Sequence, residues 1–372
     1  MAVANFLLAV SVYILIPILP IWLMSHQQMT LYETGIAFGV FGVGLFLFGA
    51  FTSFLVQQYR RHMVCVWAIV GMIVSLVMLH YFDVTRQVED SFVLVSLQRL
   101  LMGASFGLAQ MVLSSTLIID TSESFQRTEA NHSASWFSRF ALSMGPMAGL
   151  IVYPLTGFNT VLLVAGGCAL LAIILILLVH FPFRAPDDHI QMVSLDRFFL
   201  PHGFILFVNL LLITVAAGLL LSLSHDVRFY AMMMVGFLLA IMAQRFVFRE
   251  AELKSEVVTG LILMAAAVLL LLTRSQSVVA YISPLFVGFG LGIIGSRFLL
   301  FFIKLSRHCQ RGTSQSTYML GWESGLALGV GMGFAVCHAE PRLVLLMALA
   351  LILSALLLYQ FTHNWFLTHK NR

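Results

Sequence analysis

Long apolar stretches constrain this chain more than any other feature of its sequence. Twelve can be marked, at roughly residues 3–24, 35–56, 63–81, 92–119, 134–153, 161–181, 204–223, 229–248, 257–272, 278–303, 318–337 and 343–361. A helix needs roughly 20 apolar residues to span the hydrocarbon core of a bilayer. Only helices and closed barrels satisfy their backbone hydrogen bonds there. The pattern therefore predicts an all-α integral membrane protein with twelve transmembrane helices.

The composition excludes a soluble globular protein. Of 372 residues, 60% are apolar and 10% charged, and the mean hydropathy is +0.98. A soluble protein of this length needs more charge to cover its surface, and the loops leave no room for a soluble catalytic domain. The first stretch lacks the basic segment and cleavage site of a signal peptide, so we expect it to be the first transmembrane helix.

The longest polar interval divides the stretches into two sets of six. It predicts an N-terminal six-helix bundle at residues 1–181, an inter-bundle loop at 182–203 and a C-terminal six-helix bundle at 204–372. An offset of 184 residues relates the two sets: Gln126-Arg127 recurs as Gln310-Arg311, Gly145 as Gly329 and Gly149 as Gly333. This fits two parallel six-helix repeats with a site between them, near the middle of the membrane.

The positions of lysine and arginine predict the orientation. With twelve spans, 13 of these residues fall on one side and 4 on the other, while Arg99, Arg139 and Arg297 fall inside spans. Cytoplasmic loops carry the excess of positive charge. Both termini are therefore expected in the cytoplasm.

Metal and cofactor sites are not indicated. The four cysteines show no CxxC spacing and no disulfide framework, so they are interpreted as small core residues. No HxxxH pair lies within a span, and no cluster of His, Asp and Glu suggests a membrane-embedded enzyme. We expect no metal, no cofactor and no enzymatic activity.

Five segments, in the expected order along the chain, resemble the major facilitator superfamily, most closely its bacterial drug-efflux-like branch. They are YILIPILP (13–20), SFLVQQYRRH (53–62), RLLMGASFG (99–107), MGPMAG (144–149) and RGTSQSTYMLGWESGLALG (311–329). The resemblance covers the whole chain. It implies two pseudo-symmetric six-helix bundles and transport by alternating access.

The loop after the second span departs from the family pattern. Family members usually carry an aspartate where this chain has Gln57 and a glycine where it has Arg60. The resemblance implies a gating loop at Gln57, Arg60 and Arg61, in which the aspartate takes part in a charged latch between helices. Gln57 can hydrogen-bond but cannot form that ion pair. The alternative for Arg60 and Arg61 is that they only anchor the loop on the positive side.

Glu323 is the strongest candidate for a functional side chain. We expect it to be the only acidic residue inside a span, near mid-depth. An ionisable group there is costly and usually faces a cavity or a partner. The hypothesis is that Glu323 couples transport to protons or binds substrate. The alternative is a permanent salt bridge.

Arg139 is the candidate partner of Glu323. It occupies the position in the fifth span that Glu323 occupies in the eleventh, at the 184-residue offset. The two are predicted to pair across the central cavity in one state and to separate in another. Alternatively, Arg139 extends along its own helix to the cytoplasmic interface.

Two further arginines fall inside spans. Arg99 stands at the arginine of the fourth-helix motif, and the resemblance implies a role in coupling; the alternative is a structural arginine. Arg297 lies about two turns from the cytoplasmic end of its helix, which favours extension to the interface over cavity lining.

Trp136 and Trp322 are possible cavity-lining residues, because each precedes a candidate charge by one turn or less. A cavity that contained all four candidate charges would favour an anionic or zwitterionic substrate. One that contained only Glu323 and aromatic walls would favour lipophilic cations. The sequence leaves both open.

These observations predict a secondary active transporter of a small organic solute in the bacterial inner membrane, with proton-coupled efflux favoured. The alternatives are a proton-coupled metabolite importer and a non-transporting membrane sensor or scaffold of the same fold. The expected partners are the solute, protons and membrane lipid, without nucleic acid, and the expected state is a monomer.

Overall fold

The computed structural model describes residues 1–85, 91–121, 127–181, 191–248 and 251–370. Throughout these ranges the regular structure is helical, and no strand occurs in them. The predicted residues Arg86, Gln126, Arg184, Arg249 and Arg372, and residues 182–190 of the predicted loop, lie outside the described part of the chain.

Fifteen α-helices and four short helical turns follow one another in the described ranges. They are α1 (Ala2–Tyr13), α2 (Ile18–Ser25), α3 (Leu31–Gly44), η1 (Gly49–Phe51), α4 (Thr52–Gln58), α5 (Arg61–Thr85), α6 (Ser91–Val112), η2 (Leu113–Leu117), α7 (Ile118–Asp120), α8 (Arg127–Thr156), α9 (Phe158–Leu177), η3 (Pro201–Gly203), α10 (Phe204–Leu223), α11 (Val227–Phe246), α12 (Leu253–Thr273), α13 (Val279–Leu305), η4 (His308–Gln310), α14 (Arg311–Ala335) and α15 (Pro341–His369).

Ten helical segments in these ranges are long and apolar enough to cross a membrane. The helices α8 and α14, with 30 and 25 residues, are long enough but more polar. With them the described residues provide the twelve predicted spans. Most of α14 is buried inside the protein, so its polar side chains avoid lipid.

The first and second predicted spans are interrupted, which apolarity alone did not reveal. The first divides into α1 and α2 around Ile14–Pro17, because Pro17 has no N–H to continue the helical bonding. Leu15 and Ile16 instead bond three residues back, to the carbonyls of Val12 and Tyr13. The second divides into α3 and α4. An interrupted helix in a membrane is tolerated where protein or a cavity surrounds it.

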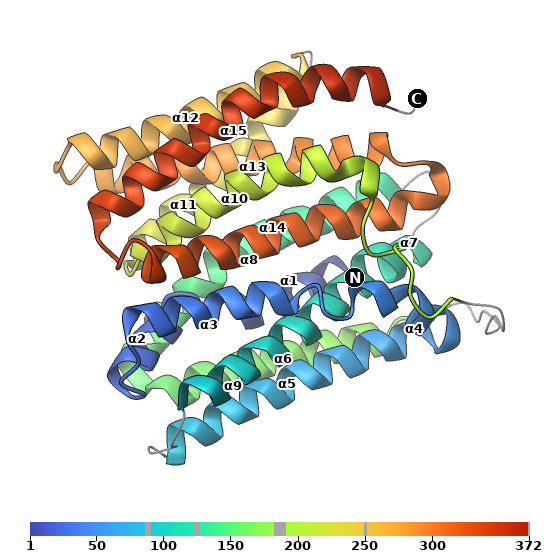
Figure 1. Cartoon of the computed structure of the whole chain (residues 1–372), viewed down its shortest axis with the longest axis horizontal. Helices are drawn as coiled ribbons and strands as arrows, with labels where there is room; N and C mark the ends of the chain where they lie inside the picture. Colours follow the sequence, from blue (N-terminus) through green and yellow to red (C-terminus); the bar gives the residue numbers. More distant parts are fainter. Residues whose placement is uncertain (86–90, 122–126, 182–190, 249–250, 371–372) are drawn as a thin grey trace.

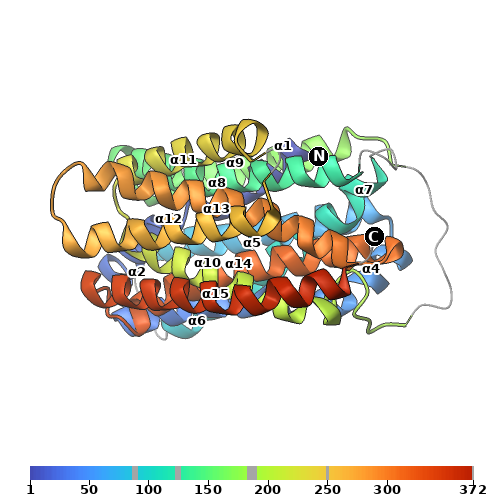
Figure 2. The same ribbon diagram turned by 90° about the horizontal axis from the view of Figure 1, so that it is seen from above.

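The long helices form two groups side by side (Figure 1). The helices α1 to α9 pack mainly on one another, and so do α10 to α15. Figure 2 shows the long helices running roughly parallel when seen from above. The groups meet where α14 contacts α3 and α6, and where α8 contacts α11 and α13. The two more polar helices thus lie at the interface.

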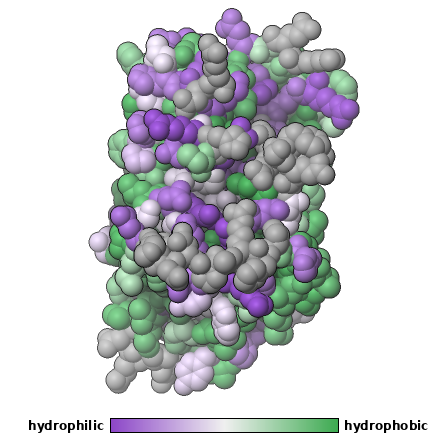
Figure 3. All heavy atoms as spheres, turned by 90° about the vertical axis from the view of Figure 1, so that its right-hand side faces the viewer, coloured by the Kyte–Doolittle hydropathy of each residue, from purple (hydrophilic) through white to green (hydrophobic). Residues whose placement is uncertain are grey.

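Both chain termini lie toward the same end of the helices, on the right of Figure 1. We call it the terminal end and the opposite end the far end. Hydrophilic residues gather on the terminal end, while apolar ones follow its margins (Figure 3). Large apolar side chains are exposed along the flanks, for example Leu163 (74%) of α9 and Leu178 (75%), directly after α9. Such a surface fits lipid rather than water.

Glycines at the repeat-related positions make the same kind of contact in both groups. A methyl group added at Gly149 of α8 would lie 2.5 Å from the carbonyl oxygen of Ile14, next to the end of α1. One added at Gly329 of α14 would lie 2.2 Å from the carbonyl oxygen of Val215 in α10. The fifth helix therefore packs on the first as the eleventh packs on the seventh, as expected for a duplicated bundle.

The far end is closed by direct contact between the groups. A methyl group added at Gly35 of α3 would lie 2.5 Å from the carbonyl oxygen of Gly331 in α14. One turn further in, the rings of Phe38 and Phe334 stack with centroids 6.4 Å apart. The small residues let the two backbones approach, and little space is left between them there.

Candidate functional site

Glu323 is a buried carboxylate at the middle of α14. It lies twelve residues from each end of the helix, about 18 Å along its axis, and is 3% exposed. Its Oε1 accepts a hydrogen bond from the hydroxyl of Tyr13, 2.5 Å away. Tyr13 ends α1, directly before the interruption of the first span. This bond therefore joins the two groups of helices at mid-depth.

Arg139 lies on α8 and is 1% exposed. Its Nη2 donates to the hydroxyls of Ser135, at 2.7 Å, and Tyr318, at 3.2 Å. Its guanidinium carbon lies 4.5 Å from the ring centre of Trp136 and 5.8 Å from that of Trp322. The guanidinium is therefore held by hydroxyls and aromatic faces from both groups.

A cavity of about 30 Å³ lies between these two side chains, and we call it the central cavity. This is enough for a water molecule or two. It is lined by Asn5 of α1, by Gln110, Ser114 and Ile118 of the fourth span, by Ala134, Ser135, Ser138 and Arg139 of α8, and by Gln315, Tyr318, Met319, Trp322 and Glu323 of α14.

The predicted pairing of Arg139 with Glu323 is not formed in this structure. Both line the central cavity, but no contact within ion-pair distance joins them. Side chains on a helix lean toward its N-terminus. Arg139 accordingly reaches toward Ser135 and Tyr318, nearer the terminal end, while Glu323 bonds across to Tyr13. The repeat places both residues at the cavity without directing them at each other.

A second small cavity lies on the other side of Glu323, toward the far end, and we call it the far cavity. Its volume is also about 30 Å³, and it is lined by Val12, Tyr13, Leu15, Ile16, Phe38, Phe41, Arg99, Glu323, Leu326, Ala327 and Val330. Glu323 therefore lines both cavities: the central cavity is largely polar, and the other residues of the far cavity are apolar apart from Arg99 and Tyr13.

Arg99 lies in the far cavity without an acidic partner among the described residues. It is 2% exposed, and its guanidinium lies 4.6 Å from the ring centre of Phe41 and 5.4 Å from that of Phe38. Its Nη1 contacts the sulfur of Met102, and its Nε has no partner. The arginine of the fourth-helix motif is thus stabilised mainly by aromatic faces.

The two tryptophans take different positions. Trp322 lines the central cavity. Trp136 packs between Arg139 and α13, where a methyl group added at Gly292 would lie 3.2 Å from its ring. Trp136 therefore positions Arg139 and is not among the residues that line the three cavities described here.

Arg297 is not at the cavity. Its Nε and Nη2 both lie 2.6 Å from Oε2 of Glu256, in the first turn of α12. Glu256 is 1% exposed. The expectation that Glu323 is the only acid within a span was therefore wrong, because the buried helix begins before the apolar stretch. Arg297 is held by this ion pair instead of extending to the interface.

The predicted gating loop is held by hydrogen bonds of Gln57 and Ser53 and by an ion pair of Arg61, without the charged latch that the resemblance implies. Gln57 donates to the hydroxyl of Ser53, 3.1 Å away. Ser53 in turn donates to Asp196 at 3.4 Å, and Thr313, at the start of α14, donates to the same carboxylate at 3.0 Å. Arg61 pairs with Asp120 at 2.6 Å, and Arg60 is exposed. The acid near the start of α14 is therefore Asp196, from the loop between the groups.

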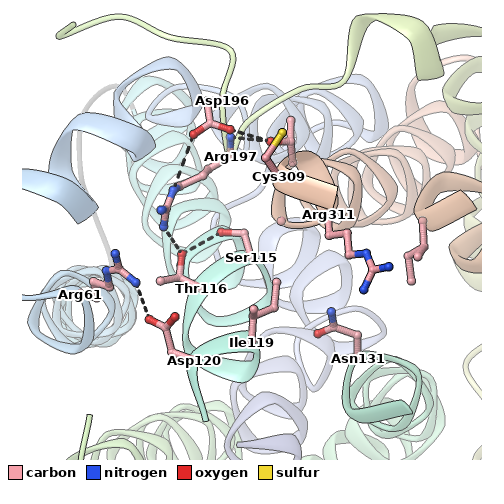
Figure 4. Close-up of a pocket in the computed structure, with 13 residues that line it drawn as sticks. Arg61, Ser115, Thr116, Ile119, Asp120, Asn131, Asp196, Arg197, Cys309 and Arg311 are labelled. Carbon is pink, nitrogen blue, oxygen red and sulfur yellow. Dashed lines mark hydrogen bonds and ion pairs between the residues drawn. The ribbon is translucent and has the colours of Figure 1, made fainter. Parts of the chain in front are cut away.

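The described part of that loop, residues 191–203, contacts both groups of helices. Ser194 donates its backbone N–H to the carbonyl of Ala50, and Arg197 donates from its side chain to Thr116. The backbone N–H groups of Arg197 and Leu200 bond to the hydroxyls of Thr313 and Thr317 in α14. Figure 4 shows Asp196 and Arg197 between the two groups. We call residues 194–200 the bridging segment.

A larger cavity, of about 210 Å³, opens beside the bridging segment at the terminal end. Its lining includes Arg61, Asp120, Asn131, Arg197 and Arg311 (Figure 4). The terminal end is thus hollowed where the far end is closed, and the bridging segment spans the gap between the groups beside this hollow.

Replacing Asp196 by alanine is expected to loosen the bridging segment. A hydrogen bond to a charged group contributes about 1.5–3 kcal/mol, so the backbone N–H groups of residues 194–200 should exchange with deuterium at least about tenfold faster. Peptide-resolved hydrogen exchange measures this. Glu340→Ala, at an exposed acid of the far end, is the matched control. Equal exchange in both variants would show that Asp196 does not hold the segment.

Several residues of the site carry no sequence signal that singles them out. Asn5 and Tyr13 are scattered polar residues of the apolar first span, Gln110 is one of several polar residues of α6, and Asp196 lies in a loop with other charges. Tyr13 and Asn5 were detectable only as polar exceptions on a proline-interrupted first span. No group of three His, Cys, Asp or Glu in the described part of the chain could hold a metal. The site offers proton exchange, hydrogen bonds and one fixed guanidinium.

Comparison with solved structures gives close agreement in fold at low sequence identity. A bacterial homologue of the iron transporter ferroportin, crystallised in an outward-facing state, is 14% identical and superposes with a TM-score of 0.68, over 96% of this chain and 97% of that one. The human organic anion transporter MFSD10 is 16% identical and superposes with a TM-score of 0.70, over 96% of this chain and 97% of that one. An auto-inhibited peptide transporter of the POT family is 12% identical, with a TM-score of 0.71 over 97% of this chain and 96% of that one.

The family is established by sequence as well. No curated protein matches the chain, but the family model described as Major Facilitator Superfamily matches residues 1–330. That span includes Tyr13, Arg99, Arg139 and Glu323. The chain belongs to the Major Facilitator Superfamily, and it is a multi-pass membrane transporter rather than an enzyme.

Proposed function

We propose that this protein is a secondary active transporter that moves a small organic solute by alternating access and couples its movement to protons through Glu323. Tyr13, Arg139 and Arg99 form the immediate surroundings of that carboxylate. The moving bodies are residues 1–181 and 204–372, joined by the loop at 182–203.

The position of Glu323 carries this proposal. It is a lining residue of both the central and the far cavity, and its hydrogen bond with Tyr13 crosses from one group of helices to the other. A carboxylate in that place meets water from one side or the other, depending on which end of the groups separates. It can then take up a proton on one side and release it on the other.

The charge distribution supports a cytoplasmic terminal end. Among the described side chains, nine lysines and arginines lie near that end and three near the far end. Those near the terminal end are Arg60, Arg61, Arg197, Arg245, Lys254, Lys304, Arg307, Arg311 and Lys370. We place the protein in the bacterial inner membrane as a monomer surrounded by lipid, with both termini cytoplasmic.

The direction of transport is part of the proposal. Proton-driven export of the solute is the direction that the resemblance implies, and proton-coupled import of a metabolite is the alternative. A non-transporting sensor of the same fold would show no solute movement under any gradient.

Replacing Glu323 by glutamine tests the coupling. Purified protein is placed in liposomes that contain a pH-sensitive dye, and a panel of small acids, amines and neutral sugars is added. At least one solute should change the internal pH with the unmodified protein. Glu323→Gln should reduce this pH-coupled flux to the level of empty liposomes while exchange of labelled solute at equal pH continues, because the amide cannot carry a proton.

Glu340→Gln, the same change at an exposed acid of the far end, is the matched control and should transport normally. Undiminished pH-coupled flux in Glu323→Gln would contradict the coupling role. Absence of flux with every solute in the unmodified protein would favour the sensor.

A further inference from the structure

Residues from four helices that line the central cavity carry polar atoms without a partner. These atoms are Oδ1 of Asn5, Nε2 of Gln110, Nε and Nη1 of Arg139, and Oε1 of Gln315. Buried polar atoms in native proteins nearly always have partners, so each exception asks for an explanation. Five of the exceptions among the described residues belong to the lining of this one small space. A ligand that offers both acceptors and a donor would satisfy them together.

The aromatic faces at this site are already occupied by a cation. Arg139 lies over the rings of Trp136 and Trp322 at 4.5 Å and 5.8 Å. These faces are where a lipophilic cation would otherwise bind. Such a cation would have to displace Arg139 from these rings or lie next to its positive charge. Each of these arrangements is unfavourable in the interior of the membrane, where charges of the same sign repel strongly.

The charges around the cavity do not balance. The ionisable or charged side chains around Glu323 that line the central and far cavities are Tyr13 of α1, Arg99 of α6, Arg139 of α8 and Tyr318 of α14. Two of these are arginines, and Glu323 is the one carboxylate among the described lining residues. The excess is one positive charge when Glu323 is ionised and two when it is protonated, so an added anion lowers the uncompensated charge in both states, and such charge is costly inside a membrane.

We infer that the central cavity binds a small organic monoanion when the two groups of helices move apart around it, because its present volume of about 30 Å³ holds only a water molecule or two. A carboxylate of this anion is held by Arg139, and a neighbouring hydroxyl or carbonyl group is held by Gln110, Gln315 or Asn5. A carboxylate fits a guanidinium with free N–H donors. A phosphate is less suitable, because it is larger and its second charge would lie near Glu323. This inference rests on the proposed transport function and names its substrate class.

The same charges indicate how solute and proton are coupled. Protonation of Glu323 removes the negative charge next to the bound anion, so proton and anion each favour binding of the other. A proton and an anion that favour each other's binding are carried across the membrane in the same direction. An exported cation would instead compete with the proton for the carboxylate. The site therefore supports the importing alternative over proton-driven export.

Binding to the purified protein tests the substrate class without any gradient. The probes are short-chain 2-hydroxy and 2-oxo carboxylates, each paired with its own neutral amide, and tetraethylammonium. Binding is followed by tryptophan fluorescence, since Trp136 and Trp322 flank Arg139, and by the thermal midpoint. At least one carboxylate should bind the unmodified protein, and its amide and the ammonium ion should not.

Arg139→Gln should raise the dissociation constant of that carboxylate at least about tenfold, which is about 1.4 kcal/mol. Arg139→Lys, which keeps the charge but loses the planar guanidinium, should give an intermediate value. Arg342→Gln, at an exposed arginine of the far end, should bind normally. The thermal midpoint without ligand shows whether each variant is folded.

Three outcomes would overturn the inference. The first is that no carboxylate binds the unmodified protein. The second is that an amide or the ammonium ion binds as tightly as the carboxylate, and the third is that Arg139→Gln leaves binding of the carboxylate unchanged. Glu323→Gln should still bind the anion, because the amide resembles the protonated acid. If Glu323→Gln binds the anion and its pH-coupled flux is undiminished, the coupling role of Glu323 is contradicted, and the inferred substrate class is not.

Discussion

Replacing Gly103 by alanine is expected to destabilise the protein by about 3 kcal/mol, the upper end of the usual cost of overpacking. A methyl group at this position of α6 would lie 2.2 Å from the carbonyl oxygen of Phe41 in α3. A backbone oxygen cannot rotate away as a side chain can, so α3 and α6 must separate. The contacts at Gly44 and Gly107, where added methyl groups would also lie 2.5 Å or less from carbonyl oxygens of the facing helix, would then weaken.

The matched control is Gly166→Ala on α9, where an added methyl group meets no atom within 4 Å. Alanine is the better helix former by about 1 kcal/mol, so this variant should be as stable as the unmodified protein or more stable. The thermal midpoint and the yield of monodisperse protein in detergent measure both changes. Equal midpoints for the two variants would show that α3 and α6 are not in the close contact described.

Replacing Arg297 by methionine should cost about 3–5 kcal/mol, the usual effect of leaving one partner of a buried ion pair alone. Both bonds from Arg297 go to one oxygen of Glu256, which is 1% exposed. The variant leaves this carboxylate between α12 and α13 without its cation. A fall in the thermal midpoint measures the loss.

The double replacement of Arg297 and Glu256 by methionine is the decisive comparison. Apolar residues of similar size often replace a buried pair at little cost, so the double variant should regain most of the lost stability. If it is no more stable than Arg297→Met, the ion pair is not what the single replacement breaks. Solute binding should be unaffected in the double variant, because neither residue lines the central cavity.

The fold was predictable from sequence because length and apolarity are local properties. A stretch of apolar residues identifies its own span without knowledge of its neighbours. The fifth and eleventh spans were the hardest to recognise by this measure, since α8 and α14 fall below the apolarity of the other ten segments. Their repeat-related glycines, such as Gly145 and Gly329, made the duplication visible.

The partners of the buried charges were not predictable, because they depend on which helix faces which. Glu256 lies 41 residues before Arg297 and stands just outside an apolar stretch. Tyr13 lies 310 residues before Glu323. A tyrosine in an apolar helix gives no sign that it will bond to a distant carboxylate.

The pairing of Arg139 with Glu323 shows the limit of reasoning from symmetry. Equivalent positions in two repeats reach the same cavity, and both residues do line it. The direction of each side chain depends on its own helix and on local acceptors, here Ser135 and Tyr318 for Arg139. Proximity was predictable from the sequence, and contact was not.

The bridging segment has a consequence for the speed of the transport cycle. Residues 194–200 bond to the first group of helices at Ala50 and Thr116 and to α14 at Thr313 and Thr317. If the two groups separate at the terminal end, either the bonds to the first group or the bonds to α14 must be exchanged for bonds to water. The turnover rate would then depend on a stretch of chain that never touches the solute, and a change there could alter the rate without altering affinity.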